Sequence, residues 1–169
     1  MPLIKVGPKG AAEAADPWRF LADEEALPET GTVAVSLARW QRERAALLAR
    51  KEPVGLRLKA GEHPKAVEGD VGRLGLIALE FPKWTDGRAF SYARTLREQY
   101  GYKGELRAVG QVVRDTLLFM HRCGFDAYEI ARPDAVAAFL KALAEIDVFY
   151  QPTGDGAPTV WALRRRGAA

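Results

Sequence analysis

Short apolar runs alternate with longer amphipathic stretches along most of this chain. From Thr32 onward, each run has the length of a β-strand, and glycine or proline residues often separate it from the next segment. Between the runs, apolar residues recur at intervals of three and four, which is the spacing of one helical face. Strands that alternate with helices in this way predict consecutive βα units and a parallel sheet.

The predicted elements divide the chain into an arm, one domain and a tail. Residues 1–31 are rich in glycine, alanine, proline and acids, and we expect an irregular arm with a short strand at Leu3–Val6. Residues 164–169 form a basic tail that begins with three arginines. Residues 32–163 form a single α/β domain, with predicted strands at Thr32–Val35, Val54–Lys59, Leu76–Phe81, Leu106–Val109, Ala127–Ile130 and Thr159–Leu163.

Single charged residues alternate with apolar ones inside the predicted strands, as at Arg57, Glu80, Arg107 and Glu129. A sheet that helices cover on both faces has nearly continuous apolar strands instead. We therefore expect helices on one face and a charged concave face, as in part of a (β/α) barrel. A complete barrel needs about 200 residues or more, so a half-barrel that closes against a second copy, as a homodimer, would fit. The alternative is an open, doubly wound three-layer sheet whose strand charges pair at its edges.

A polar turn after Leu76–Phe81 carries most of the candidate chemistry. Pro82 ends the strand because it has no N–H for the ladder, and a helix is expected to begin at Gly87. Thr85 or Asp86 can cap this helix by accepting a hydrogen bond from its free N–H groups. Helix starts and the carboxyl ends of parallel strands commonly bind anions. The turn therefore predicts an anion site, although a capping Asp86 and solvated basic side chains explain the same residues without a ligand.

Basic side chains from three neighbouring units follow predicted strand ends and are expected at the same rim. Their guanidinium and ammonium groups suit sulfate, phosphate or a carboxylate. The candidate catalytic acids or bases are Glu80 and Asp86, and we expect a shifted pKa for Glu80 if it lies inside a curved sheet. The residues expected to bind an anion or an anionic cofactor are Lys83, Thr85, Gly87, Arg88, Arg107, Arg114 and Arg132.

The histidines and the single cysteine are weak candidates. His121 and Cys123 lie near the end of their helix, at the opposite rim, and their spacing of two directs them apart. We expect Cys123 to be a small buried residue, and His63, a loop residue before proline, to be structural. No metal site is expected, and the chain has no dinucleotide, Walker, nucleophile-elbow or HExxH motif.

Composition narrows the class of protein. The chain has 169 residues, of which 48% are hydrophobic and 28% charged, which is ordinary for one globular domain. A net charge of +3 does not suit a dedicated nucleic-acid binder. The single cysteine excludes an intramolecular disulfide and cysteine-based metal centres within one chain. The first residues lack a signal-peptide core, and no apolar run approaches the about 18 residues of a membrane helix, so we expect a cytoplasmic protein.

The stretch Phe81–Ile130, FPKWTDGRAFSYARTLREQYGYKGELRAVGQVVRDTLLFMHRCGFDAYEI, resembles an uncharacterised bacterial family, a domain of unknown function. The resemblance extends from about Thr32 to Asp155. Members of that family are often labelled oxidoreductases of sulfite reduction, and their genes often neighbour those of sulfate assimilation. The characteristic positions include Phe81, Pro82, Thr85, Asp86, Gly87, Arg88, Arg94, Gly104, Arg107, Arg114, Asp115, Arg122, Cys123, Gly124 and Phe125.

The resemblance implies redox chemistry, but this chain has no nicotinamide fingerprint and no cluster ligands, so the cofactor is unknown and would lie on the rim or on a partner. We therefore expect an accessory protein of assimilatory sulfite or sulfate reduction that binds an anion, with a sulfite reductase component as its partner. One alternative is an enzyme that uses Glu80 or Asp86 as base. Another is an interaction module that presents Trp84, Phe90 and Tyr92 to a reductase.

Overall fold

The computed structural model describes residues 2–7 and 10–166, and its strands form one sheet in the order β2-β1-β8-β7-β6-β5-β4-β3. Strands β3 to β8 are parallel to one another. Strand β1 pairs antiparallel with β8 and with β2. The bounds are β1 (Leu3–Gly7), β2 (Gly10–Ala14), β3 (Arg19–Phe20), β4 (Val33–Ser36), β5 (Val54–Leu58), β6 (Leu74–Phe81), β7 (Glu105–Gly110) and β8 (Ala127–Glu129).

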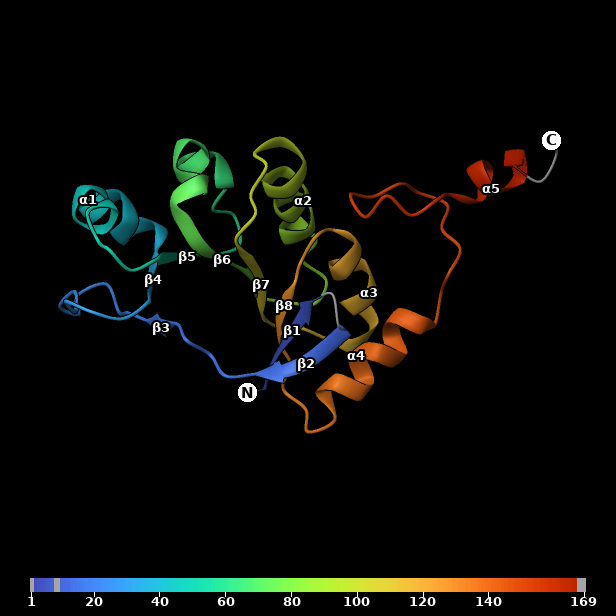
Figure 1. Cartoon of the computed structure of the whole chain (residues 1–169), viewed down its shortest axis with the longest axis horizontal. Coiled ribbons are helices and arrows are strands. Elements are labelled where there is room, and N and C mark those ends of the chain that lie inside the picture. Colours follow the sequence, from blue (N-terminus) through green and yellow to red (C-terminus); the bar gives the residue numbers. More distant parts are fainter. Residues whose placement is uncertain (1, 8–9, 167–169) are drawn as a thin grey trace.

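The sheet is curled, and the helices that follow its strands lie on the convex face (Figure 1). The predicted partial barrel is therefore confirmed, and the doubly wound alternative is excluded. The helical elements are α1 (Leu37–Leu48), the 3-10 helix η1 (Pro64–Arg73), α2 (Arg88–Arg94), its π-helical continuation η2 (Thr95–Gln99), α3 (Arg114–Arg122), α4 (Ala135–Ala144) and α5 (Val160–Arg166).

Strand alternation divides the apolar side chains between the two faces of the sheet. Leu56, Ile77 and Leu106 face the helices and belong to the main core, with Trp40 of α1 and Met120 of α3. The residues that alternate with these along each strand face the concave side, because successive side chains of a strand point to opposite faces. The predicted charged concave face thus follows directly from the pattern of the strands.

A second, smaller core lies on the concave face. Ala34, Leu76, Ala78 and Val109 of the sheet are buried there, with the arm residues Trp18 and Phe20 packed against them. Figure 1 shows the arm crossing this side of the sheet between β2 and β3. The arm therefore covers part of the concave surface. Its first strand, β1, confirms the strand predicted at Leu3–Val6, whereas β2 and β3 were not predicted.

One predicted strand is wrong. Thr159–Leu163 was expected to be the last strand, but only Thr159 forms a β-bridge, to Phe149, and Val160–Arg166 is the helix α5. A short apolar run does not distinguish strand from helix by periodicity alone. Of the predicted basic tail, Arg164, Arg165 and the backbone of Arg166 belong to α5, and residues 167–169 lie outside the described residues.

Candidate functional site

Arg107 of β7 is the most buried charged group on the concave face. Its side chain has no exposed surface. It binds both carboxylate oxygens of Asp16 at 2.7 and 2.8 Å and donates to Glu105 at 2.8 Å and to Glu129 at 3.2 Å. The ring of Phe20 lies 5.8 Å from the guanidinium carbon. Arg107 was predicted from the sequence to bind a ligand anion, and in this structure acids of the chain itself surround it.

The pKa of Asp16 reflects this contact. Burial raises the pKa, but the hydrogen bonds from Arg107 and from the backbone N–H of Trp18 outweigh burial and hold it below its ordinary value. Burial likewise opposes the charge on Arg107, while Asp16 and Glu105 raise its pKa. Both groups are therefore ionised at neutral pH, and together they attach the arm to the sheet.

A hollow of about 340 Å³ lies at the carboxyl ends of β4, β5 and β6. The hollow is lined by Arg57 of β5, by Lys59 directly after β5 and by Glu80 of β6. The arm closes it on one side with Phe20 to Asp23. This edge of the sheet is where ligands collect in parallel α/β folds, so we take the hollow as the candidate site.

The polar groups of the hollow are arranged in two pairs. Arg57 donates from Nε to one carboxylate oxygen of Glu80 at 3.2 Å, and its Nη2 lies 3.0 Å from the same oxygen, while its Nη1 has no acceptor among the described residues. The hydroxyl of Ser36 donates to Asp23 at 2.6 Å. Lys59 is exposed and forms no ion pair among the described residues. Its ammonium and the Nη1 of Arg57 are the open donors of this site.

The turn after β6 is organised by an internal ion pair. Asp86 accepts from Arg88 at Nε and Nη2, at 3.0 and 2.6 Å, and from the Arg88 backbone N–H at 3.2 Å. The hydrogen bonds from Arg88 lower the pKa of Asp86 to about 2. Asp86 therefore makes a weak base, and Arg88 has its own counter-ion. Of the other predicted turn residues, Lys83, Thr85 and Gly87 are exposed.

The remaining rim arginines are also paired with acids of the chain itself. Arg114 donates to Glu145 at 2.7 Å, and Arg132 binds Asp134 at 2.5 and 2.7 Å. The predicted anion-binding residues other than Arg107 thus lie along the rim, but Arg88, Arg114 and Arg132 each turn to a separate acid. Arg57 and Glu80 were predicted from sequence to be charges of the concave face. Their position on adjacent strands, with Lys59 two residues after Arg57, is the signal that would have moved the candidate site from the turn into the sheet.

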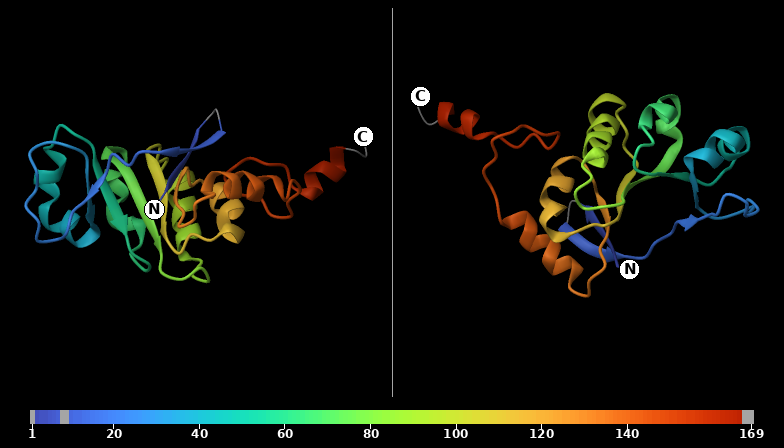
Figure 2. Two further views of the ribbon diagram at one scale, coloured as in Figure 1. Left: turned by 90° about the horizontal axis from the view of Figure 1, so that it is seen from below. Right: turned by 180° about the vertical axis from the view of Figure 1, so that it is seen from behind.

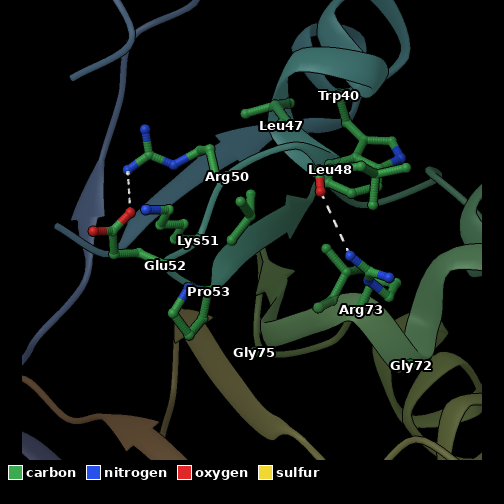
Figure 3. A pocket seen from close by; sticks show the side chains of 12 residues that line it. Trp40, Leu47, Leu48, Arg50, Lys51, Glu52, Pro53, Gly72, Arg73 and Gly75 are labelled. Atoms are coloured by element: carbon green, nitrogen blue, oxygen red, sulfur yellow. Dashed lines mark hydrogen bonds and ion pairs between the residues drawn. The ribbon is translucent and has the colours of Figure 1, made fainter. Parts of the chain in front are cut away.

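A second hollow, of about 320 Å³, lies at the opposite end of the strands, between α1 and the starts of β5 and β6 (Figure 3). Arg50, Lys51 and Arg73 line it. Arg50 donates to the carbonyl oxygens of Pro28 and, at 2.7 Å, of Gly31, and Arg73 reaches the Leu48 carbonyl at 3.5 Å. These arginines hold loop backbones together, so we assign this hollow a structural role.

His63 and Cys123 occupy structural positions. His63 caps η1 by accepting the backbone N–H of Lys65 at 3.1 Å, and its ring meets that of Tyr92 edge-on at 5.1 Å. Cys123 is buried, as predicted, and burial raises the pKa of its thiol to about 11. Residues 2–7 and 10–166 contain no cluster of three or more His, Cys, Asp or Glu side chains that could hold a metal ion.

Comparison with known proteins adds a family to this geometry. Residues 55–161 match the family described as "Bacterial protein of unknown function (DUF934)". The match spans more than half of the 169 residues. The chain belongs to the DUF934 family. Among curated proteins, none matches the chain.

The DUF934 match separates the candidate site into two parts. Arg57, Lys59, Glu80 and Arg107 lie inside the matched residues 55–161. Asp16 and the arm that covers the concave face lie before them. In this DUF934 protein the arm therefore completes both the hollow and the Arg107 cluster from outside the matched region. Within the described residues, no helix is long and apolar enough to cross a membrane.

Proposed function

We propose that this protein is an accessory protein of assimilatory sulfite or sulfate reduction that binds a small anionic ligand, or the anionic group of a cofactor, in the hollow formed by Arg57, Lys59 and Glu80. The association with sulfur metabolism rests on the family resemblance of the sequence. The binding of an anion rests on the open ammonium of Lys59 beside the open Nη1 of Arg57.

The acids of the hollow define the rest of the ligand. Glu80 holds Arg57 in place through Nε and Nη2, and Asp23 accepts from the Ser36 hydroxyl. A purely anionic guest would meet these carboxylates at a cost, because like charges repel at short range. The site therefore favours a ligand with an anionic group directed to Lys59 and Arg57, and hydroxyl or amino groups directed to Glu80 and Asp23.

An enzymatic role would depend on Glu80. Of the two predicted bases, Asp86 is disfavoured because Arg88 lowers its pKa to about 2. Glu80 lines the hollow beside the proposed anion-binding groups, where a base could reach a bound ligand. We retain binding as the proposal, since the arrangement provides recognition groups but identifies no reaction.

A second candidate function is docking of a reductase partner at the same rim. Trp84 is 59% exposed, and its backbone N–H is held by Gln111 at 3.2 Å. Phe90 is half-buried against Phe81 and Phe119, and Tyr92 is half-buried against His63. Trp84 is therefore the one of the three predicted anchors that offers a large exposed surface to a partner.

The proposal is tested by thermal-shift measurements with sulfate, sulfite, phosphate, adenosine phosphosulfates, flavins and nicotinamides. A ligand that binds only the native state, at a free concentration of about 100 times its Kd, adds about 2.7 kcal/mol to the free energy of unfolding. We expect a rise in Tm with at least one anionic ligand, and loss of that rise in Lys59→Met.

Lys83→Met is the matched control because Lys83 is an exposed rim lysine outside the residues that line the hollow. It should keep the ligand-induced shift. A shift that Lys83→Met removes and Lys59→Met preserves would return the site to the turn after β6. Silence with every ligand, together with capture of a purified sulfite reductase component by the wild type but not by Trp84→Ala, would support the docking function instead.

A further inference from the structure

The charges that line the candidate hollow sum to zero. Arg57 and Lys59 are cationic, Glu80 and Asp23 are anionic, and the other residues that line it are uncharged. A free anion would meet the two carboxylates as well as the two cations, at a cost in repulsion. A guest that carries one anionic and one cationic group meets an opposite charge at each end and adds no net charge. The hollow therefore suits a zwitterion better than a simple anion.

The opposite charges of the hollow lie on neighbouring strands. Strands β5 and β6 pair in register up to Leu58 and Leu79, and Lys59 and Glu80 each follow this last pair directly. Both alternate with a leucine of the main core, so both side chains are on the concave face. Neighbouring strands are about 4.8 Å apart. One small molecule can therefore reach both charges.

Each of these charged groups keeps an open position. Arg57 contacts Glu80 at Oε2, and Oε1 of Glu80 accepts no hydrogen bond among the described residues. Lys59 forms no ion pair within that part of the chain, although Glu80 is on the next strand. The Nη1 of Arg57 is open as well. An open carboxylate oxygen thus accompanies two open cationic donors, which is the complement of a zwitterion.

The rest of the hollow is small and largely apolar. The arm, which runs from β2 across the sheet towards α1 (Figures 1 and 2), lines it with Phe20 and Ala22, and β4 adds Ala34 and Val35. Phe20 is half-buried and packs on the concave cluster that contains Ala34. The volume of about 340 Å³ is near the lower end of the range of about 300–1,000 Å³ for small-molecule pockets. These walls suit a small apolar group and leave a third charge without a partner.

We propose that the ligand of the hollow is an α-amino acid with an apolar side chain. Its carboxylate binds the ammonium of Lys59 and the Nη1 of Arg57, its ammonium binds Oε1 of Glu80, and its side chain lies towards Phe20. In an α-amino acid a single carbon atom carries both charged groups, which matches opposite charges on neighbouring strands. The choice of an amino acid rests on the proposed function, because the carboxylate is the anionic group that the hollow is proposed to bind.

Asp23 is the other acid of the hollow, and its surroundings differ from those of Glu80. It accepts the hydroxyl of Ser36 at 2.6 Å, and Ser36 pairs in register with Arg57 from the side of β5 opposite to β6. Asp23 therefore already has a donor from the chain and lies across β4 from the open oxygen of Glu80. We assign the ammonium of the ligand to Glu80.

Isothermal titration calorimetry of the full chain with matched probes tests this assignment. Leucine carries both charged groups, isocaproate is leucine without the amino group, and isoamylamine is leucine without the carboxylate. We expect leucine to bind at least about 10-fold more tightly than either, because each of the other two lacks a hydrogen bond between charged groups. The probe ε-aminocaproate, whose charged groups lie at opposite ends of the molecule, should also bind more weakly than leucine.

Variants separate the two charged contacts. Glu80→Gln removes the partner of the ammonium, so the preference for leucine over isocaproate should disappear while isocaproate keeps its affinity. Lys59→Met should weaken the binding of both probes. Glu68→Gln is the matched control at an exposed acid that does not line the hollow, and it should leave the preference for leucine unchanged. Circular dichroism checks that each variant is folded.

Failure of this proposal can be told apart from failure of the proposed function. If isocaproate or phosphate binds and Lys59→Met weakens it, while leucine binds no tighter than isocaproate, the amino acid is wrong and the anion site stands. Absence of binding by every probe and every anion would overturn both. Tighter binding of ε-aminocaproate than of leucine, or a preference for leucine that Asp23→Asn removes and Glu80→Gln preserves, would overturn the assignment of an α-amino acid to Glu80.

Discussion

Asp16 and Arg107 are 91 residues apart in sequence, yet both oxygens of the carboxylate bind the guanidinium, at 2.7 and 2.8 Å. Asp16 belongs to the arm and Arg107 to the centre of the sheet. Trp18 and Phe20 follow Asp16 and pack on the concave apolar cluster. One charged pair and two aromatic rings therefore hold the arm over the sheet, and the arm in turn closes one side of the candidate hollow.

Replacing Asp16 with Asn should lower the free energy of unfolding by about 1.5–3 kcal/mol, the range for a hydrogen bond to a charged group. Glu105 and Glu129 would still neutralise Arg107, which keeps the loss below that of a fully orphaned charge. Urea denaturation at pH 7 measures this difference. Glu13 is an exposed acid on the same arm, and Glu13→Gln should change the free energy of unfolding little.

Asp16→Asn also tests how the free energy of unfolding depends on pH. The pKa of Asp16 is lower in the folded protein than its ordinary value of 3.8. The ionised carboxylate therefore stabilises the fold above about pH 4, and this stability is lost as the pH falls through the folded-state pKa. The difference in unfolding free energy between wild type and Asp16→Asn should be largest near neutral pH and shrink below pH 4. An equal difference at pH 7 and at pH 3 would contradict the assignment.

Gly110 ends β7 with φ of +91°, and a Cβ atom there would lie 2.5 Å from the carbonyl oxygen of Phe81. Gly31 has a similar φ of +90°, but a Cβ atom would meet nothing within 4 Å. We expect Gly31→Ala to cost about 1–2 kcal/mol for the backbone conformation alone. Gly110→Ala should cost about 1–3 kcal/mol more because of the clash. Thermal denaturation of the two variants compares them directly.

Cys123 should react slowly with thiol reagents. Burial raises its pKa to about 11, so at pH 8 about one thiol in a thousand is ionised, and the thiolate is the reactive form. A chromogenic disulfide reagent should label the native protein far more slowly than the protein in denaturant. Equal rates would show an accessible thiol and would reopen a chemical role for this residue.

The sheet and its charged face could be predicted from sequence because they depend on local alternation. Arg57, Glu80, Arg107 and Glu129 each interrupt an apolar strand, and the resulting one-sided charge favours helices on one face only. The pairing of β2 with β1 was not predicted, since GAAEA has little β-propensity of its own and its pairing is set by the neighbouring strand. Strand β3 was missed for a similar reason, being only two residues long.

The arrangement of the rim could be predicted less well. Arg88 and Arg132 each pair with an acid two residues away, and this spacing was visible in the sequence. The partners of Arg107 and Arg114 come from distant parts of the chain, and only the tertiary structure identifies them. Several basic residues on one rim are therefore weaker evidence for an anion site than their number suggests, because each can form an ion pair with an acid of the chain itself.

The most direct test of the proposed function is the Kd of an anionic ligand for wild type, Lys59→Met and Lys83→Met, measured by isothermal titration calorimetry. Loss of one charge-assisted hydrogen bond costs about 1.5–3 kcal/mol, so Lys59→Met should bind about 10- to 150-fold more weakly, with Lys83→Met unchanged. Equal affinity of wild type and Lys59→Met would contradict an anion site in the hollow at Arg57 and Lys59.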